Sequence, residues 1–335
     1  MSVSTLTTVT PVYNGVKYLE DLILQIEAFR LSLEQQGSAL TLIESIFVID
    51  ECIDDSAELL YQIQKEKPWV RIIELSKNFG QHPATVAGIL YSSGDWIATL
   101  DEDLQHKPNY ILDLLKTSLK NSSDVCYAKS GESIHDSIVK DKITIFSKKF
   151  LGYLISNKNV SQFNSFRVMR GSLARAAASI SNYDSYFDVI LTWYTDRMSQ
   201  CDIPLRDLRN ATGESSSGYS FMSLLKHGKK VLTTSKIKIF RAGLIIGFLS
   251  FLLSLILSVY ALISRLLNPE KVFITEWSSI MVSILFFGGL LSLLTGIIIE
   301  LMSDAHLQSK GKPSFYVVDR SRDMILFNQI KEYHN

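Results

Sequence analysis

The chain has 335 residues, and its 34 Lys and Arg balance its 34 Asp and Glu, so its formal net charge is zero. This balance argues against bulk electrostatic binding to nucleic acid, which requires a basic surface that displaces counterions. The three cysteines, Cys52, Cys126 and Cys201, lie far apart, which excludes a disulfide scaffold and a zinc ribbon and fits a reducing compartment. The first residues lack the basic and apolar regions of a signal peptide.

Apolar runs alternate with helical patterns through the first hundred residues. The runs cover 6–12, 42–49, 70–75 and 96–100, and the helical patterns between them cover 17–35, 55–65 and 83–91. This alternation predicts an α/β fold with a mostly parallel sheet flanked by helices. Because ligands of such sheets bind beyond the carboxyl ends of the strands, the residues directly after each run are the candidates for function.

Carboxylates follow two of these runs. Asp50 and Glu51 come after the second run, and Asp101, Glu102 and Asp103 come after the fourth. No glycine-rich phosphate motif follows any run, which disfavours dinucleotide and P-loop sites. Two carboxylates two residues apart can share a divalent cation, which neutralises a bound diphosphate and makes a nucleoside diphosphate a better leaving group. Most isolated D-x-D motifs are solvated turn residues, but the position after a buried strand favours the metal interpretation here.

Two long apolar stretches lie near the C-terminus. Residues 242–263 and 277–299 contain no charged residue. At about 1.5 Å per residue each stretch reaches roughly 33 Å, enough for a hydrocarbon core of about 30 Å. Buried core helices are the alternative, but these rarely run so far without a charge. The sequence therefore predicts two transmembrane helices.

The flanking charges predict the orientation of these helices. Basic residues gather before the first stretch and after the second, whereas the loop 264–276 holds two basic and two acidic residues. The positive-inside rule then places both termini in the cytoplasm, with the chain as a multi-pass protein of the cytoplasmic (inner) membrane. The expected domains are a catalytic domain at 1–218, a juxtamembrane segment at 219–236, a membrane region at 237–302 and a tail at 303–335. The juxtamembrane segment reads equally well as an interfacial helix on lipid or a solvated linker.

Four motifs at the strand ends resemble those of one family. The segment TPVYN at 10–14 is similar to V-P-x-Y-N-E, and IDECIDD at 49–55 is similar to V-D-D-G-S-x-D. The segments LSKNFG at 75–80 and DEDLQHKP at 101–108 are similar to L-S-R-N-F-G and D-A-D-L-Q-H-P-P. Over nearly the whole chain, these motifs and the two spans resemble family-2 glycosyltransferases of the polyprenyl-phosphate type. This group includes bactoprenol-phosphate glucosyltransferases and, more distantly, dolichol-phosphate mannose synthase.

The resemblance implies a GT-A fold and an inverting transfer of a sugar from a nucleotide sugar to polyprenyl (undecaprenyl) phosphate. Asp101 and Asp103 would bind Mg²⁺ or Mn²⁺, and the catalytic residues would be Asp103, Gln105 and Arg167, the last within FRVM at 166–169, which matches F-R-L-M. The residues implied to bind the nucleotide sugar are Pro11, Tyr13, Asn14, Asp50, Asn78, Asp101 and Glu102.

The acceptor side is less well marked. Arg167, Lys129, Lys148 and Arg209 are candidates for the acceptor phosphate, although a single lysine is more often a solvated surface charge. Two departures stand out: the glutamate that ends V-P-x-Y-N-E is Gly15 here, and the acid that commonly precedes F-R-L-M is Ser165. A phosphate monoester is mostly dianionic at neutral pH, so it can attack without a general base.

Several alternatives stay open. The same fold could act on another lipid or a lipid-linked glycan, or a degenerate enzyme could serve as a scaffold in glycan assembly. On the resemblance, a UDP-sugar and in particular UDP-glucose is the first expected donor. Two spans are few for enclosing a lipid site, which favours a homo-oligomer that pools helices.

Overall fold

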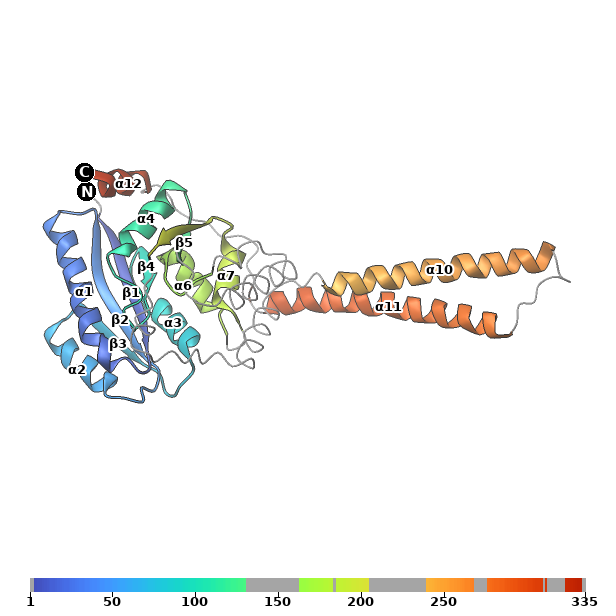
Figure 1. Ribbon diagram of the computed structural model, residues 1–335, viewed down its shortest axis with the longest axis horizontal. Helices are drawn as coiled ribbons and strands as arrows, with labels where there is room; N and C mark the ends of the chain where they lie inside the picture. The colour runs from blue at the N-terminus through green and yellow to red at the C-terminus, as the bar shows by residue number, and fades with distance from the viewer. Residues whose placement is uncertain are drawn as a thin grey trace. The chain divides into compact units, whose positions relative to one another are not determined.

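The computed structural model describes residues 3–130, 163–182, 185–204, 239–267, 276–309, 311 and 323–332 (Figure 1). These residues form two compact units. The first takes in the described residues before 205 together with 323–332, and the second takes in 239–311. The juxtamembrane segment predicted at 219–236 lies outside the described residues.

The first unit is built on one seven-stranded sheet with the order β3-β2-β1-β4-β6-β5-β7. Its strands are β1 Ser4–Val12, β2 Leu40–Ile49, β3 Val70–Glu74, β4 Trp96–Thr99, β5 Val125–Ser130, β6 Arg167–Arg170 and β7 Met198–Ile203. The pairs β1–β2, β1–β4, β2–β3 and β5–β7 are parallel, while β6 runs antiparallel to both β4 and β5. The predicted α/β fold with a mostly parallel sheet is confirmed.

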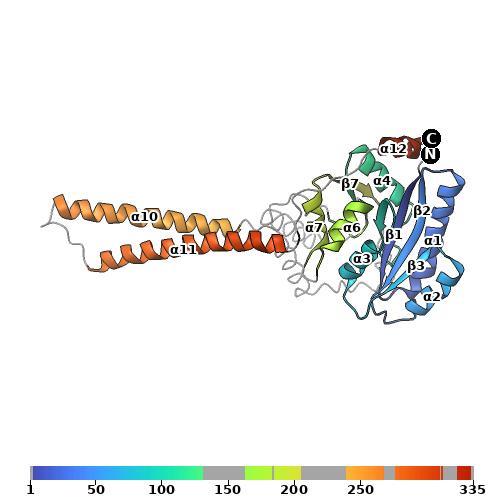
Figure 2. The same ribbon diagram turned by 180° about the vertical axis from the view of Figure 1, so that it is seen from behind.

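Helices cover both faces of the sheet (Figures 1 and 2). They are α1 Val16–Gln35, α2 Ser56–Glu66, α3 Gln81–Leu90, α4 Tyr110–Lys120, α6 Gly171–Ser179, α7 Phe187–Tyr194 and α12 Asp323–Glu332. Side chains alternate between the faces: Phe47 of β2 belongs to the core that also includes residues of α1, α2, α4 and α12, and Val48 belongs to the core that includes residues of α3, α6 and α7. Two buried cores result, as expected for a sheet that is covered on both sides.

The carboxyl ends of β1, β2, β3 and β4 meet at one edge of the sheet. Val12 lies beside Ile49 in the parallel register of β1 and β2, and Val9 lies beside Thr99 in that of β1 and β4. The loops that follow these four strands therefore come together. They carry most of the residues singled out in the sequence.

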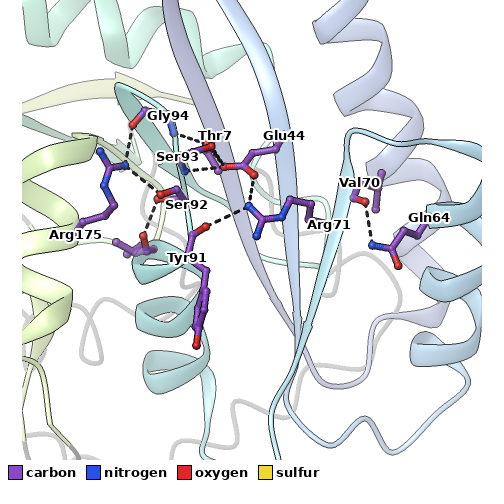
Figure 3. Close-up of polar contacts among 11 residues, drawn as sticks. Thr7, Glu44, Gln64, Val70, Arg71, Tyr91, Ser92, Ser93, Gly94 and Arg175 are labelled. Carbon is purple, nitrogen blue, oxygen red and sulfur yellow. Dashed lines mark hydrogen bonds and ion pairs between the residues drawn. The ribbon is translucent and has the colours of Figure 1, made fainter.

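A buried carboxylate organises the sheet away from this edge (Figure 3). Glu44 of β2 accepts hydrogen bonds from the Thr7 hydroxyl at 2.9 Å and from the Ser93 amide and hydroxyl at 2.7 Å each, and it pairs with Arg71 of β3. Arg175 of α6 donates to the Gly94 carbonyl at 2.9 Å. This network fixes the loop before β4 against three strands and a helix.

The second unit consists of two antiparallel helices, α10 Ile239–Leu267 and α11 Glu276–Ser309 (Figures 1 and 2). Their backbones approach closely at two glycines. A Cβ at Gly247 would lie 2.7 Å from the Leu293 amide nitrogen, and a Cβ at Gly289 would lie 2.7 Å from the Phe251 amide nitrogen. Close approach at small residues is typical of helix pairs in membranes, where dispersion replaces the hydrophobic effect.

One of the two predicted spans meets the length and apolarity of a membrane crossing among the described residues. The stretch Val282–Ile299 of α11 has a mean hydropathy of 2.4, and only 11% of it is buried within the structure. The apolar stretch of α10, Gly247–Tyr260, is shorter. Among the described residues one helix is therefore long and apolar enough to cross a membrane, by length and composition only, and the two-span prediction is not confirmed.

We predict that the Glu44 network contributes stability that depends on pH. Burial raises the pKa of the Glu44 carboxyl, but hydrogen bonds from Arg71, Ser93 and Thr7 outweigh it, so that its pKa lies below the usual 4.5. A carboxyl group whose pKa is lower in the folded than in the unfolded state stabilises the fold at pH values above its unfolded-state pKa. This stabilisation is lost as the pH falls through the folded-state pKa.

Glu44→Gln should therefore lower the free energy of unfolding by about 1–3 kcal/mol at pH 7, with a smaller difference at pH 3–4. Chemical unfolding of the full chain in detergent, followed by tryptophan fluorescence, measures both values. The control is Glu34→Gln, because Glu34 forms an exposed pair with Arg30 on α1. A loss that is equal at both pH values would contradict the ionised-network account.

Candidate active site

Asp50, at the carboxyl end of β2, holds the loop between β3 and α3. Its side chain is 2% exposed, and its two oxygens accept the Phe79 and Gly80 amide hydrogens, each at 2.7 Å. The neighbouring Glu51 accepts the Asn78 amide at 2.9 Å. The predicted nucleotide residue Asp50 therefore shapes the segment that carries the predicted residue Asn78, whose side chain is exposed.

The loop after β1 presents exposed side chains beside this segment. Tyr13 is 42% exposed and Asn14 is exposed, whereas Pro11 is buried within β1. The Tyr13 carbonyl accepts the Ile53 amide at 3.1 Å, which joins this loop to the one after β2. Tyr13, Asn14 and Asn78 are therefore exposed to a ligand, whereas the buried Pro11 is not, and its role in nucleotide binding stays a prediction.

Asp101, directly after β4, is held by neutral donors. Its Oδ1 accepts Gln81 Nε2 at 2.7 Å, and its Oδ2 accepts the Ser165 hydroxyl at 2.9 Å. His106 Nδ1 lies 3.7 Å from Oδ2, and it accepts the Asp101 amide hydrogen at 3.0 Å. The His106 ring is buried and stacks on Phe166 with 4.8 Å between centroids.

Asp103 and Glu102 have different surroundings from Asp101. Asp103 is 5% exposed, and its Oδ1 accepts the Gln105 amide at 3.3 Å. Glu102 extends to the loop after β1, where it accepts the Tyr13 and Asn14 amides at 3.0 and 3.3 Å. Burial and the charges of Asp103 and Asp54 raise the pKa of the Glu102 carboxyl against the effect of these amides.

The acidic turn is compatible with a divalent metal. No group of three or more His, Cys, Asp or Glu side chains is placed to hold a metal in the described part of the chain. Mg²⁺ needs fewer, because it takes one or two carboxylates and completes its shell with phosphate oxygens and water. Asp101 supplies a partly exposed carboxylate whose described hydrogen-bond donors, Gln81 and Ser165, are neutral, so its charge is left for a cation. With Asp103 two positions further along the chain, the types of donor present are those that Mg²⁺ takes.

Arg167 of β6 lies in a buried ion pair. Its side chain is 4% exposed, and its Nη1 contacts Asp188 of α7, which is 2% exposed. The Tyr127 hydroxyl donates to the same Asp188 oxygen at 2.9 Å. The charge of Arg167 is therefore compensated by Asp188. To bind a phosphate, the Arg167 guanidinium would have to contact it while still paired with Asp188. The role of Arg167 in catalysis and in binding the acceptor phosphate stays a prediction.

The other candidates for the acceptor phosphate are not gathered by the described structure. Lys129 is exposed and forms an ion pair with Asp202 at 3.0 Å. Lys148 and Arg209 lie outside the described residues. The position of the acceptor phosphate therefore stays a prediction.

Sequence reasoning missed three contacts that support the site. Gln81 and Ser165 bind Asp101, and Asp188 compensates Arg167. The sequence singles out Ser165 as a departure from the motif that ends in F-R-L-M, but it does not indicate the contact with Asp101. Gln81 and Asp188 carry no comparable signal, since their partners are 20 and 21 residues away in the chain.

We predict that Asp188 is essential to the fold around Arg167. Asp188→Ala leaves a buried guanidinium without its counter-ion, so the free energy of unfolding should fall by about 3–5 kcal/mol. The control is Asp202→Ala, which breaks the exposed pair with Lys129 and should cost about 0–1 kcal/mol. Chemical unfolding measures both, and equal losses for the two variants would contradict the structural importance of the buried pair.

Comparisons with known proteins show the family of the chain. Residues 7–176 match the model of glycosyl transferase family 2. The uncharacterized glycosyltransferase YkcC of Bacillus subtilis is 26% identical over 313 residues, which cover 93% of each chain. A bactoprenol glucosyl transferase of Shigella phage SfV is 23% identical and covers 82% of this chain and 87% of its own.

Among solved structures, glucosyl-3-phosphoglycerate synthase from Mycobacterium tuberculosis, in complex with Mn²⁺, UDP-glucose and glycerol 3-phosphate, is 13% identical with a TM-score of 0.40. The match covers 68% of this chain and 80% of that one. The family match spans half of the sequence; it begins within β1 and takes in β2, β3 and β4 with the acidic loops after β2 and β4. The chain is a glycosyltransferase that belongs to glycosyl transferase family 2.

Proposed function

We propose that the enzyme transfers a sugar, with glucose the first expectation, from a UDP-sugar to polyprenyl phosphate at the cytoplasmic face of the membrane. The observation that carries the proposal is the joining of two features in one chain. The first unit carries acidic residues at the carboxyl edge of its sheet, where we expect the nucleotide to bind. The second unit consists of the apolar helices α10 and α11. A relative of this length is named for glucosyl transfer to bactoprenol, which is a polyprenyl lipid.

The transfer is a single substitution at C1 of the sugar. An oxygen of the acceptor phosphate attacks C1 of the sugar, the new C1–O bond forms, and the bond from C1 to the nucleoside diphosphate breaks with its electrons on the departing oxygen. Mg²⁺ or Mn²⁺ held by Asp101 and Asp103 would neutralise that diphosphate. Because the acceptor phosphate is already an oxyanion, Ser165 can stand where a general base is otherwise expected.

Other side chains of the site would bind the donor or orient Asp101. Asp50 and Glu51 fix the loop that carries Asn78, and the exposed Tyr13 offers an aromatic face for a nucleobase. Gln81 and Ser165 keep the Asp101 carboxylate in one orientation, so that little reorganisation is needed as charge develops on the leaving group.

Chain connectivity supports two membrane crossings. After α11 the chain returns to the first unit, where Leu326 and Ile330 of α12 are buried with α4 and Asp323 pairs with Arg170. A folded unit lies on one side of a membrane, so the segment between its two parts must cross an even number of times. If α11 spans the bilayer, α10 is therefore the second span, and both termini are cytoplasmic by the positive-inside rule.

The match to YkcC also extends into these helices. It leaves 22 residues of this chain uncovered, fewer than the 34 residues of α11 alone. Part of each helix is therefore aligned with YkcC, as expected if the helices bring the enzyme to a lipid acceptor.

We predict that the double variant Asp101→Ala, Asp103→Ala abolishes transfer. The assay offers labelled UDP-glucose, UDP-N-acetyl sugars and GDP-mannose to membranes that contain undecaprenyl phosphate, with Mg²⁺ or Mn²⁺ and then with EDTA. Only the wild type with metal should form a labelled lipid. Glu34→Ala, on the far surface of α1, should retain activity. Full activity in the double variant would refute the proposed site, and a product formed only with another lipid acceptor would change the assigned acceptor.

We also predict that the loop between α10 and α11 faces the outside. In a variant without the three native cysteines, Glu270→Cys should react with an impermeant thiol reagent in intact cells, whereas Asn335→Cys should react only after permeabilisation. Labelling of both positions, or of neither, in intact cells would contradict a two-span hairpin with cytoplasmic ends.

A further inference from the structure

In the sequence Glu102 lies between the two proposed metal ligands, Asp101 and Asp103, but its side chain binds the loop after β1. Its Oε2 accepts the Tyr13 amide at 3.0 Å, and its Oε1 accepts the Asn14 amide at 3.3 Å. These contacts join residues 88 and 89 positions apart in the chain. Charge-assisted bonds of this kind are stronger than bonds between neutral groups. Glu102 thereby ties the turn after β4 directly to the end of β1.

Gly15 is explained by the same carboxylate. Its backbone has φ −114° and ψ 1°, a conformation open to any residue, so no backbone requirement selects glycine. A Cβ at this position would lie 2.4 Å from Glu102 Oε2, and the three nearest atoms all belong to Glu102. A side chain at position 15 would therefore displace Glu102 from the Tyr13 and Asn14 amides.

The contacts continue into the first turn of α1. The Gly15 amide donates to the Ser56 hydroxyl at 3.1 Å, and the Val16 amide donates to Asp54 Oδ2 at 3.0 Å. Carboxylates are favourable near a helix N-terminus, where backbone amides lack partners within the helix. Asp54 lies in the loop after β2 and Ser56 is the first residue of α2, so Glu102 is the member of this set that connects the start of α1 to the acidic turn after β4.

We propose that Glu102 is a positioning residue of the donor site, whose carboxylate occupies the space left by Gly15 and locks the loop after β1 to the metal-binding turn. The proposal rests on the proposed function. The locked loop carries the exposed Tyr13, whereas the turn carries Asp101 and Asp103, which would meet the diphosphate. The lock therefore fixes the distance between the groups that hold the two ends of a nucleoside diphosphate.

The proposal separates Glu102 from its two neighbours. A metal ligand must turn a carboxylate oxygen toward the ion, and both Glu102 oxygens are directed at backbone amides of the β1 loop. Loss of Glu102 should therefore leave metal-dependent catalysis in place and weaken the fit of the nucleotide. Asp101→Ala should instead reduce turnover itself.

The test uses three variants of the full chain: Glu102→Ala, Gly15→Ala and the double variant. UDP binding in the presence of Mg²⁺ is measured by calorimetry, and hydrogen exchange of the peptide containing Tyr13 and Asn14 is followed by mass spectrometry. Each single variant should weaken UDP binding by about tenfold and speed exchange in that peptide. The double variant should be no worse than Glu102→Ala, because the carboxylate that Gly15→Ala would displace is then absent and only the Cβ of position 102 remains, 3.3 Å away.

Kinetics supply the second readout. In both single variants the donor KM should rise by about the same factor as the UDP dissociation constant, while kcat falls by less. Glu34→Ala, far from the turn, should leave binding and exchange unchanged. A Gly15→Ala variant that behaves as the wild type, or a double variant whose loss is the product of the two single losses, would overturn the proposal.

The two proposals fail in distinguishable ways. If the wild type binds no UDP but the single variants still speed exchange at Tyr13 and Asn14, the lock stands and the donor assignment is wrong. If the wild type binds UDP and exchange is unchanged in every variant, the donor assignment stands and the lock is wrong.

Discussion

The structure depends on how one edge of the sheet accommodates its negative charge. Carboxylates from the loops after β2 and β4 are crowded there, and like charges at short range oppose one another. Most of them are compensated by backbone amides: Asp50 binds two amides of the loop before α3, and Glu102 binds two amides of the loop after β1. The acidic residues therefore form the connections between loops, and Asp101 is the one whose described donors are neutral side chains.

The same arrangement explains both departures from the family motifs. Where the motif after β1 ends in glutamate this chain has Gly15, and where the D-A-D motif has alanine this chain has Glu102. Compared with the family motifs, the carboxylate is at position 102 instead of position 15, and the small residue is at position 15 instead of position 102. These two positions are in contact. Ser165 donates to Asp101, a position where an acidic side chain would face a second carboxylate at hydrogen-bond distance. Both departures are therefore accommodated by contacts with acidic residues of the same edge.

The order of elements was predictable from the sequence, because strands buried on both faces read as continuous apolar runs and the helices between them are amphipathic. The predicted run 42–49 and β2 Leu40–Ile49 differ by two residues at one end. The loops that carry Asp50 and Asp101 were predictable for the same reason. The partners of those residues were not, since Asp50 binds backbone amides and Arg167 binds an aspartate on a later helix. Such contacts depend on three-dimensional packing that no local pattern records. The return of the chain to the first unit through α12 was likewise missed, because ten residues with two buried side chains resemble a solvated tail.

The most direct test of the account is the identity of both products made by the purified enzyme. Liposomes that contain undecaprenyl phosphate and enzyme receive the donor selected by the labelled panel, and mass spectrometry then determines the lipid product and the released nucleotide. Transfer of the sugar alone predicts a lipid with one phosphorus atom and an equal amount of nucleoside diphosphate. A lipid diphosphate with release of nucleoside monophosphate would show transfer of a sugar phosphate, and it would contradict the attack on C1 that the acidic edge is proposed to support.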